Sequence, residues 1–74
     1  MITTKVFTEN LRHLRRSKGL TQATLANLSG YSLQTIVHME AGAGPITIEK
    51  IERVAKGLQV PPWRLLWQRH CQQP

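Results

Sequence analysis

The chain has 74 residues, enough for one domain with a single modest core, and a large catalytic cleft is not expected at this size. Ten Lys and Arg against four Asp and Glu give a net charge of +6, which favours a partner rich in phosphate. The N-terminus lacks the apolar run of a signal peptide, and no stretch approaches the ~18 apolar residues of a membrane span. We therefore expect a cytoplasmic protein without a membrane partner.

Residues that could carry metal or catalytic chemistry are few and scattered. Cys71 is the only cysteine, so no disulfide can form within the chain. His13, His38 and His70 lack the spacing of metal ligands. No Ser/His/Asp grouping, carboxylate pair or phosphate loop is recognisable. We expect no metal, no cofactor and no enzymatic activity.

The first helix is predicted between Thr8, as its N-cap, and Gly19, because Leu11 and Leu14 recur at helical spacing. The basic cluster Arg15-Arg16-Ser17-Lys18 lies at its end. This helix therefore combines an apolar face with a cationic C-terminal turn.

Two further short helices follow with a tight turn between them. Thr21 begins the second helix, which ends at Gly30. Ser32 is the N-cap of a third helix, which continues to Ala41 and stops at Gly42. The spacing predicts a helix-turn-helix from Thr21 to Ala41.

The rest of the chain predicts a loop and two more helices. Ala41-Gly42-Ala43-Gly44-Pro45 cannot continue a helix, because glycine and proline both disfavour it. Thr47 starts a fourth helix, and a fifth runs from Pro62 to about Arg69. The expected apolar face of the fourth helix consists of Ile48, Ile51, Val54, Ala55 and Leu58.

Five short helices without an alternating strand pattern predict a compact all-α fold. We expect one domain over residues 1–74, with its core at residues 7–69 and with residues 1–5 and 71–74 flexible. Within it, Ala26 is small where the second and third helices approach, and Gly30 can take the left-handed conformation that the turn needs. The core positions of the third helix are Ile36 and Met39.

A wider pattern extends over residues 7–66. Its members are Leu11, Leu14, Arg15, Gly19-Leu20-Thr21-Gln22, Leu25-Ala26, Ser29-Gly30-Tyr31-Ser32, Thr35-Ile36, Glu40, Gly42, Thr47-Ile48-Glu49, Ala55, Leu58 and Leu65-Leu66. With this pattern the chain resembles the lambda-repressor-like, or Xre-type, helix-turn-helix regulators. The resemblance implies a DNA-binding domain that places its third helix in the major groove.

The resemblance assigns base contacts to the outward face and first turns of the third helix, at Ser32, Leu33, Gln34, Val37 and His38. Gln34 can pair with adenine through two hydrogen bonds, whereas Leu33 and Val37 would meet thymine methyl groups. His38 could donate to a guanine or a phosphate. Two exposed aliphatic side chains could equally border a protein-binding patch.

Phosphate contacts are implied at the start of the second helix, where Gln22 matches the glutamine of the family and Thr21 precedes it. The loop after the third helix carries no cation. The best cationic sources of phosphate affinity are therefore Arg12, Arg15, Arg16 and Lys18. The resemblance also implies a partly buried ion pair between Arg15 and Glu40.

Trp63 and Trp67 lie four residues apart on the predicted fifth helix, on a face other than that of Leu65 and Leu66. Aromatic residues are enriched in interfaces, and helix-turn-helix proteins commonly bind palindromes as two-fold dimers. We expect these two residues at a homodimer interface, although Trp67 could instead cover the core.

Two functions fit these expectations. The first is a sequence-specific transcriptional regulator, of repressor type, that binds a palindromic operator on double-stranded DNA in the nucleoid. The second is a protein-interaction module, such as an antitoxin that binds its toxin or another regulator and binds an operator secondarily. The aliphatic Leu33 and Val37, the uncharged loop and the tryptophans favour the second modestly.

Overall fold

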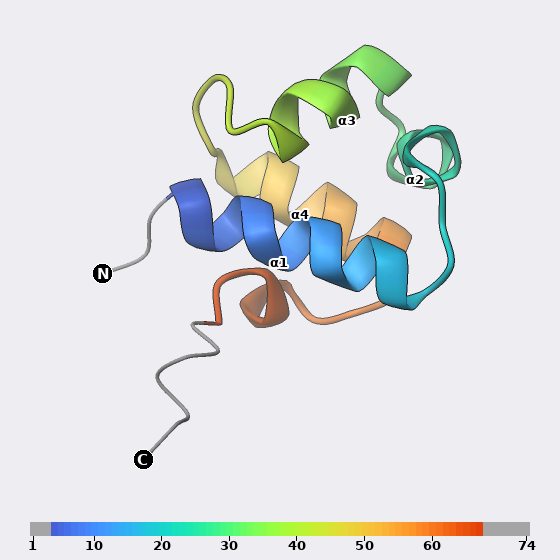
Figure 1. Cartoon of the computed structure of the whole chain (residues 1–74). Helices are drawn as coiled ribbons and strands as arrows, with labels where there is room; N and C mark the ends of the chain where they lie inside the picture. Colours follow the sequence, from blue (N-terminus) through green and yellow to red (C-terminus); the bar gives the residue numbers. More distant parts are fainter. Residues whose placement is uncertain (1–3, 68–74) are drawn as a thin grey trace.

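The computed structural model describes residues 4–67, which form four α-helices and one 3-10 turn (Figure 1). The elements in chain order are α1 (Thr4–Ser17), α2 (Gln22–Ser29), α3 (Leu33–Glu40), α4 (Ile48–Leu58) and η1 (Pro62–Leu65). No strand occurs within this range, so the all-α prediction is confirmed. None of the helices in residues 4–67 has the length and apolarity needed to cross a membrane.

The prediction of a fifth α-helix from Pro62 to Arg69 is wrong. Of residues 62–67, only Pro62–Leu65 are helical, and they form a single 3-10 turn. Pro61 and Pro62 have no N–H, and the turn closes through Arg64 N–H to the Pro61 carbonyl and Leu66 N–H to the Trp63 carbonyl. The last two residues of the predicted helix, 68 and 69, and the tail 71–74 lie outside the described residues.

The first helix begins at Thr4 and not after Thr8, so the prediction that Thr8 is its N-cap is wrong. Phe7 is 2% exposed and belongs to the core, which keeps the chain helical through this region. Thr8 is buried, and its hydroxyl donates to the Met39 carbonyl at 3.4 Å. Thr4 and Lys5, expected in a flexible segment, are part of this helix, whereas residues 1–3 lie outside the described range.

The other three α-helices start where the sequence predicts, at Thr21, Ser32 and Thr47, and all three residues are N-caps. Thr21, Ser32 and Thr47 each have extended backbone angles and accept a hydrogen bond from the backbone N–H three residues later. Gly30 ends α2 with φ of 78°, the left-handed conformation that the tight turn requires. Local chemistry thus fixes the start of each helix in the helix-turn-helix.

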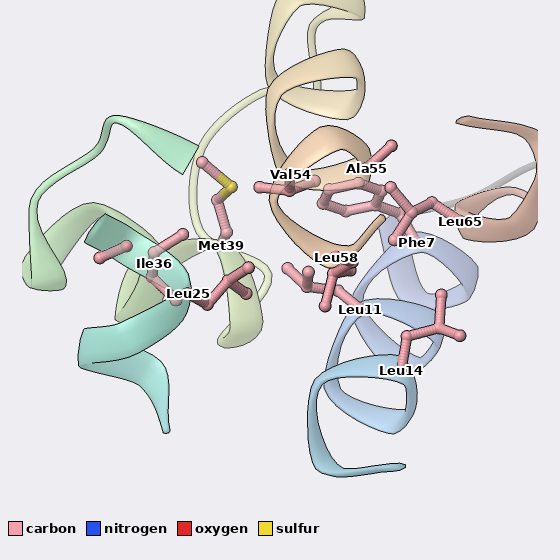
Figure 2. Close-up of a cluster of buried hydrophobic side chains, with 11 residues drawn as sticks. Phe7, Leu11, Leu14, Leu25, Ile36, Met39, Val54, Ala55, Leu58 and Leu65 are labelled. Atoms are coloured by element: carbon pink, nitrogen blue, oxygen red, sulfur yellow. The ribbon is translucent and has the colours of Figure 1, made fainter. Parts of the chain in front are cut away.

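Figure 2 shows apolar side chains from α1, α2, α3, α4 and η1 meeting in one cluster. Its fully buried members are Phe7, Leu11, Leu25, Ile36, Val54, Leu58 and Leu65. Ile48 is 75% exposed, so its expected place on the apolar face of α4 is wrong. Ile46, in the preceding loop, packs against the core, and Ile51 is the first residue of α4 to do so.

Two close contacts join segments that are distant in the sequence, one within the supporting elements and one between them and the helix-turn-helix. The Asn10 side-chain amide donates to the carbonyls of Leu65 (2.9 Å) and Trp67 (2.7 Å), which fastens the C-terminal turn to α1. Gly57 allows α2 to lie close against α4, because a Cβ at this position would be 2.6 Å from Ser29 Oγ. The supporting elements therefore pack directly on the unit that carries α3.

Candidate nucleic-acid interface

One side of α3 faces solvent and the other faces the core, as the 3.6-residue period of a helix requires. Leu33 and Val37 are 49% and 38% exposed, and Gln34 and His38 are exposed beside them. We call these four residues the recognition face. The buried side of the helix consists of Ile36, Met39 and Glu40. The recognition face thus carries hydrogen-bonding groups and apolar groups, and no carboxylate.

Ser32 lies just before the recognition face, and its side chain caps α3. The Ser32 hydroxyl oxygen accepts from Thr35 N–H at 3.2 Å and lies 2.9 Å from the Thr35 hydroxyl. Thr21 does the same at the start of α2, where it accepts from Thr24 N–H and donates to the Thr24 hydroxyl. Both hydroxyls therefore have partners inside the protein.

Arg15, Glu40 and Gln22 form a hydrogen-bonded network that joins α1, α2 and the end of α3. Arg15 Nε donates to Glu40 Oε2 at 2.5 Å and Arg15 Nη2 donates to Glu40 Oε1 at 3.1 Å, while Nη1 donates to the Leu20 carbonyl. Gln22 Nε2 also donates to Glu40 Oε1, at 3.1 Å. The Glu40 side chain is 4% exposed and that of Arg15 is 12% exposed. This network fixes the C-terminal end of α3 relative to both neighbouring helices.

The structure brings only some of the expected phosphate-binding cations together. Arg12 and Arg16 lie one turn apart on the outer side of α1, where they line a shallow hollow with Glu9 and His13. Lys18 lies apart from this pair, in a hollow lined by Leu20, Leu28, Lys56, Gly57 and Gln59. Arg12, Arg16 and Lys18 are exposed.

The loop between α3 and α4 is shaped by Gly42 and Gly44, which have φ of 78° and 81°. Lys50 reaches back to this loop, and its Nζ donates to the Pro45 carbonyl at 3.1 Å. The turn between α2 and α3 is held from the other side, since the Arg53 guanidinium lies 5.2 Å from the Tyr31 ring centroid. Both ends of α3 are thus braced by residues of α4.

Three cationic residues near the site were not predicted from the sequence: Lys5, Lys50 and Arg53. Lys5 lies on the first turn of α1, which the sequence prediction left outside the helix. Phe7, Leu11 and Leu14 are spaced i, i+4, i+7, and that spacing was the signal for the longer helix. No comparable sequence signal marks Lys50 or Arg53, because their contacts depend on tertiary packing.

The two tryptophans meet at the C-terminal turn. Their rings are 6.5 Å apart at 84°, and the Arg64 guanidinium lies 6.0 Å from the Trp63 ring and 5.3 Å from the Trp67 ring. Trp63 is 58% exposed and Trp67 is half-buried. Within residues 4–67 no group of His, Cys, Asp and Glu side chains is arranged to hold a metal ion, and His70 and Cys71 lie outside that range.

Residues 7–66 match the family model described as a helix-turn-helix domain. The chain belongs to this family. The resemblance to Xre-type regulators stated from the sequence is therefore confirmed. A comparison with curated proteins gave no match.

Solved structures show the same fold. The restriction-modification controller protein C.AhdI from Aeromonas hydrophila is 37% identical, with a TM-score of 0.77 over 81% of this chain and 91% of that one. The controller protein C.Esp1396I is 27% identical, with a TM-score of 0.78 over 84% of this chain and 80% of that one. The hypothetical transcription factor NHTF from Neisseria is 25% identical, with a TM-score of 0.88 over 97% and 88% of the two chains.

Proposed function

We propose that this helix-turn-helix transcriptional regulator reads DNA sequence with the recognition face of α3 and binds a palindromic operator as a homodimer. One observation carries the proposal: Leu33, Gln34, Val37 and His38 are exposed together on a helix whose opposite side is locked by the buried Glu40 network. A rigid helix that presents base-sized groups suits the major groove. Two of the similar structures are restriction-modification controllers, which supports a regulator of this compact kind.

The chemistry of the recognition face favours A·T pairs. The amide of Gln34 can donate to N7 and accept from N6 of adenine, and the side chains of Leu33 and Val37 can contact the thymine methyl group. His38, on the last turn of α3, can donate to a guanine or a phosphate. Ser32 would reach the groove only from the capped start of α3.

Phosphate contacts would come from groups that flank α3. The Gln22 side-chain amide donates one N–H to Glu40 and retains a second N–H for a phosphate oxygen. The backbone N–H groups at the start of α2, which Thr21 caps, add further donors at the same place. The Glu40 carboxylate holds the Arg15 guanidinium beside Gln22, so Arg15 would contact a phosphate at the same place. The exposed Arg12, Arg16 and Lys18 supply attraction that does not depend on base sequence.

The exposed tryptophan surface supports the dimer. Trp63 is more than half exposed on the C-terminal turn, and the Arg64 guanidinium lies near both rings, so the cluster presents an amphipathic surface. Trp63→Ala should shift sedimentation towards the monomer, while Ile48→Ala, at another exposed apolar residue, should not. An unchanged dimer would remove Trp63 from the interface.

A second candidate function is a protein-interaction module such as an antitoxin, with operator binding secondary. The exposure of Leu33 and Val37 on the recognition face favours it, because aliphatic side chains also form protein-binding patches. A toxin-like gene beside this one, whose product binds this chain and is released by Leu33→Asp, would support the alternative.

The DNA-reading proposal is tested by measuring how variants of the protein bind duplexes that the unaltered protein selects from a random-sequence pool. Gln34→Ala should change which bases are preferred, whereas Arg16→Ala should weaken binding to every duplex alike. If Gln34→Ala binds with the same base preference as the unaltered protein, Gln34 does not read DNA. A regulator of this type would act in the cytoplasm at the nucleoid.

A further inference from the structure

The first turns of α1 lie against the end of α3 and the loop that follows it. The Thr4 methyl carbon lies 3.6 Å from the place that a Cβ on Gly42 would occupy. One turn later, the Thr8 hydroxyl donates to the Met39 carbonyl. The residues of α1 next to these contacts are therefore neighbours of the loop at residues 41–47.

Lys5 lies on this part of α1 and is exposed. Within residues 4–67 it forms no ion pair with a carboxylate. Lys5, Arg12 and Arg16 are spaced i, i+7, i+11, so they form one line along the helix, and the exposed Glu9 at i+4 lies in the same line. The line therefore carries three cations and one carboxylate. It runs beside the line of Thr4, Thr8 and Arg15 that touches α3 and its loop. At a rise of 1.5 Å per residue this line is about 16 Å long.

The loop beside Lys5 has no free cation of its own. Residues 41–45 are uncharged, and the ammonium group of nearby Lys50 is bonded to the Pro45 carbonyl. At the other side of the network, Gln22 and Arg15 donate to Glu40, and each retains further side-chain N–H groups that can reach a phosphate. A helix that lies in the major groove has a phosphate strand on each side, and phosphate contacts fix its orientation on the duplex.

We propose that Lys5 binds a DNA phosphate and, with Arg12 and Arg16, forms a basic stripe on α1 that follows the strand beside the α3–α4 loop. This inference rests on the proposed DNA-binding function and extends its contact surface to the N-terminal turn of α1. Lys5 acts as a point charge, so its contribution is independent of base sequence and is reduced by salt. It replaces the cation that the uncharged loop does not provide.

The test is the salt dependence of DNA binding by Lys5→Gln, compared with Lys56→Gln as a matched control. Lys56 is also an exposed lysine, on the last turn of α4, and its loss changes the net charge by the same amount. Binding to a duplex recovered from a random pool is measured between about 50 and 200 mM salt, and melting temperatures are recorded in parallel.

Lys5→Gln should lower the steepness of log affinity against log salt by about 0.9 for each bound protomer, with the base preference unchanged. Lys5→Arg should keep the full steepness. The melting temperature of Lys5→Gln should not fall, because a cation in the first turn opposes the helix dipole.

Equal steepness for Lys5→Gln and the unaltered protein would overturn the Lys5 proposal alone, as would an equal loss in Lys56→Gln. If the unaltered protein selects no duplex, the proposed function fails, and the Lys5 proposal fails with it.

Discussion

Replacing Glu40 with alanine should destabilise the protein far more than replacing the exposed carboxylate Glu9. Glu40 is buried and accepts hydrogen bonds from Arg15 and Gln22, and it lies where α1, α2 and α3 meet. The variant removes this carboxylate and leaves the Arg15 guanidinium, 12% exposed, without its counter-charge.

The expected loss follows from that burial. Removing one partner of a buried ion pair costs about 3–5 kcal/mol, because the remaining charge stays desolvated. Arg15 keeps its bond to the Leu20 carbonyl and has some access to water, which places the loss near the lower end, about 3 kcal/mol. A domain of this size has a total stability of about 4–11 kcal/mol, and its melting temperature falls by about 4–8 °C per kcal/mol. We therefore expect a drop of roughly 12–24 °C.

Thermal and urea unfolding, followed by circular dichroism, measure this drop. Glu9→Ala is the control, because Glu9 is an exposed carboxylate on the outer side of α1, and its melting temperature should change little. The double variant Arg15→Met with Glu40→Leu should recover part of the loss, since it leaves no charge unpaired. Equal melting shifts for Glu40→Ala and Glu9→Ala would refute the reasoning.

Three further predictions concern the scaffold, each measured by urea unfolding. Asn10→Ala should cost about 2 kcal/mol, because two main-chain carbonyls of the C-terminal turn lose their donor; a change below about 0.5 kcal/mol would contradict this. Gly57→Ala should cost about 1 kcal/mol of stability, although alanine has the better helix propensity, because its Cβ would lie 2.6 Å from Ser29 Oγ. Adding Ser29→Ala to this variant should restore most of the lost stability, and additive losses would argue against the clash. Gln59→Gly should stabilise by about 0.5 kcal/mol, because Gln59 has φ of 60°, and a loss would show that its side chain contributes more than its backbone strain costs.

Features set by local chemistry were predictable from the sequence. Thr21, Ser32 and Thr47 cap their helices through a hydrogen bond from the backbone N–H three residues later, so the neighbouring residues in the sequence suffice to predict where these helices start. The exposed residues of α3 likewise follow from the helical period once its start at Ser32 is known. The exposed side of α3 could therefore be predicted from the sequence.

Features set by tertiary packing were not predictable. Thr8 has the chemistry of an N-cap, but burial of Phe7 carries the helix back to Thr4. This shift makes Lys5 a helical residue, one position after Thr4, whose side chain lies against Gly42 of the α3–α4 loop. The bond from Asn10 to the Leu65 carbonyl joins residues 55 positions apart. No local pattern indicates such a pairing.

Selection of duplexes from a random-sequence pool tests the central claim most directly, because the claim is that the recognition face of α3 distinguishes base sequences. We expect an enriched palindrome, with A·T pairs in its half-sites opposite Leu33, Gln34 and Val37 and with half-site centres about one helical turn apart. Recovery of no enriched sequence, from a protein that still binds DNA in low salt, would contradict it.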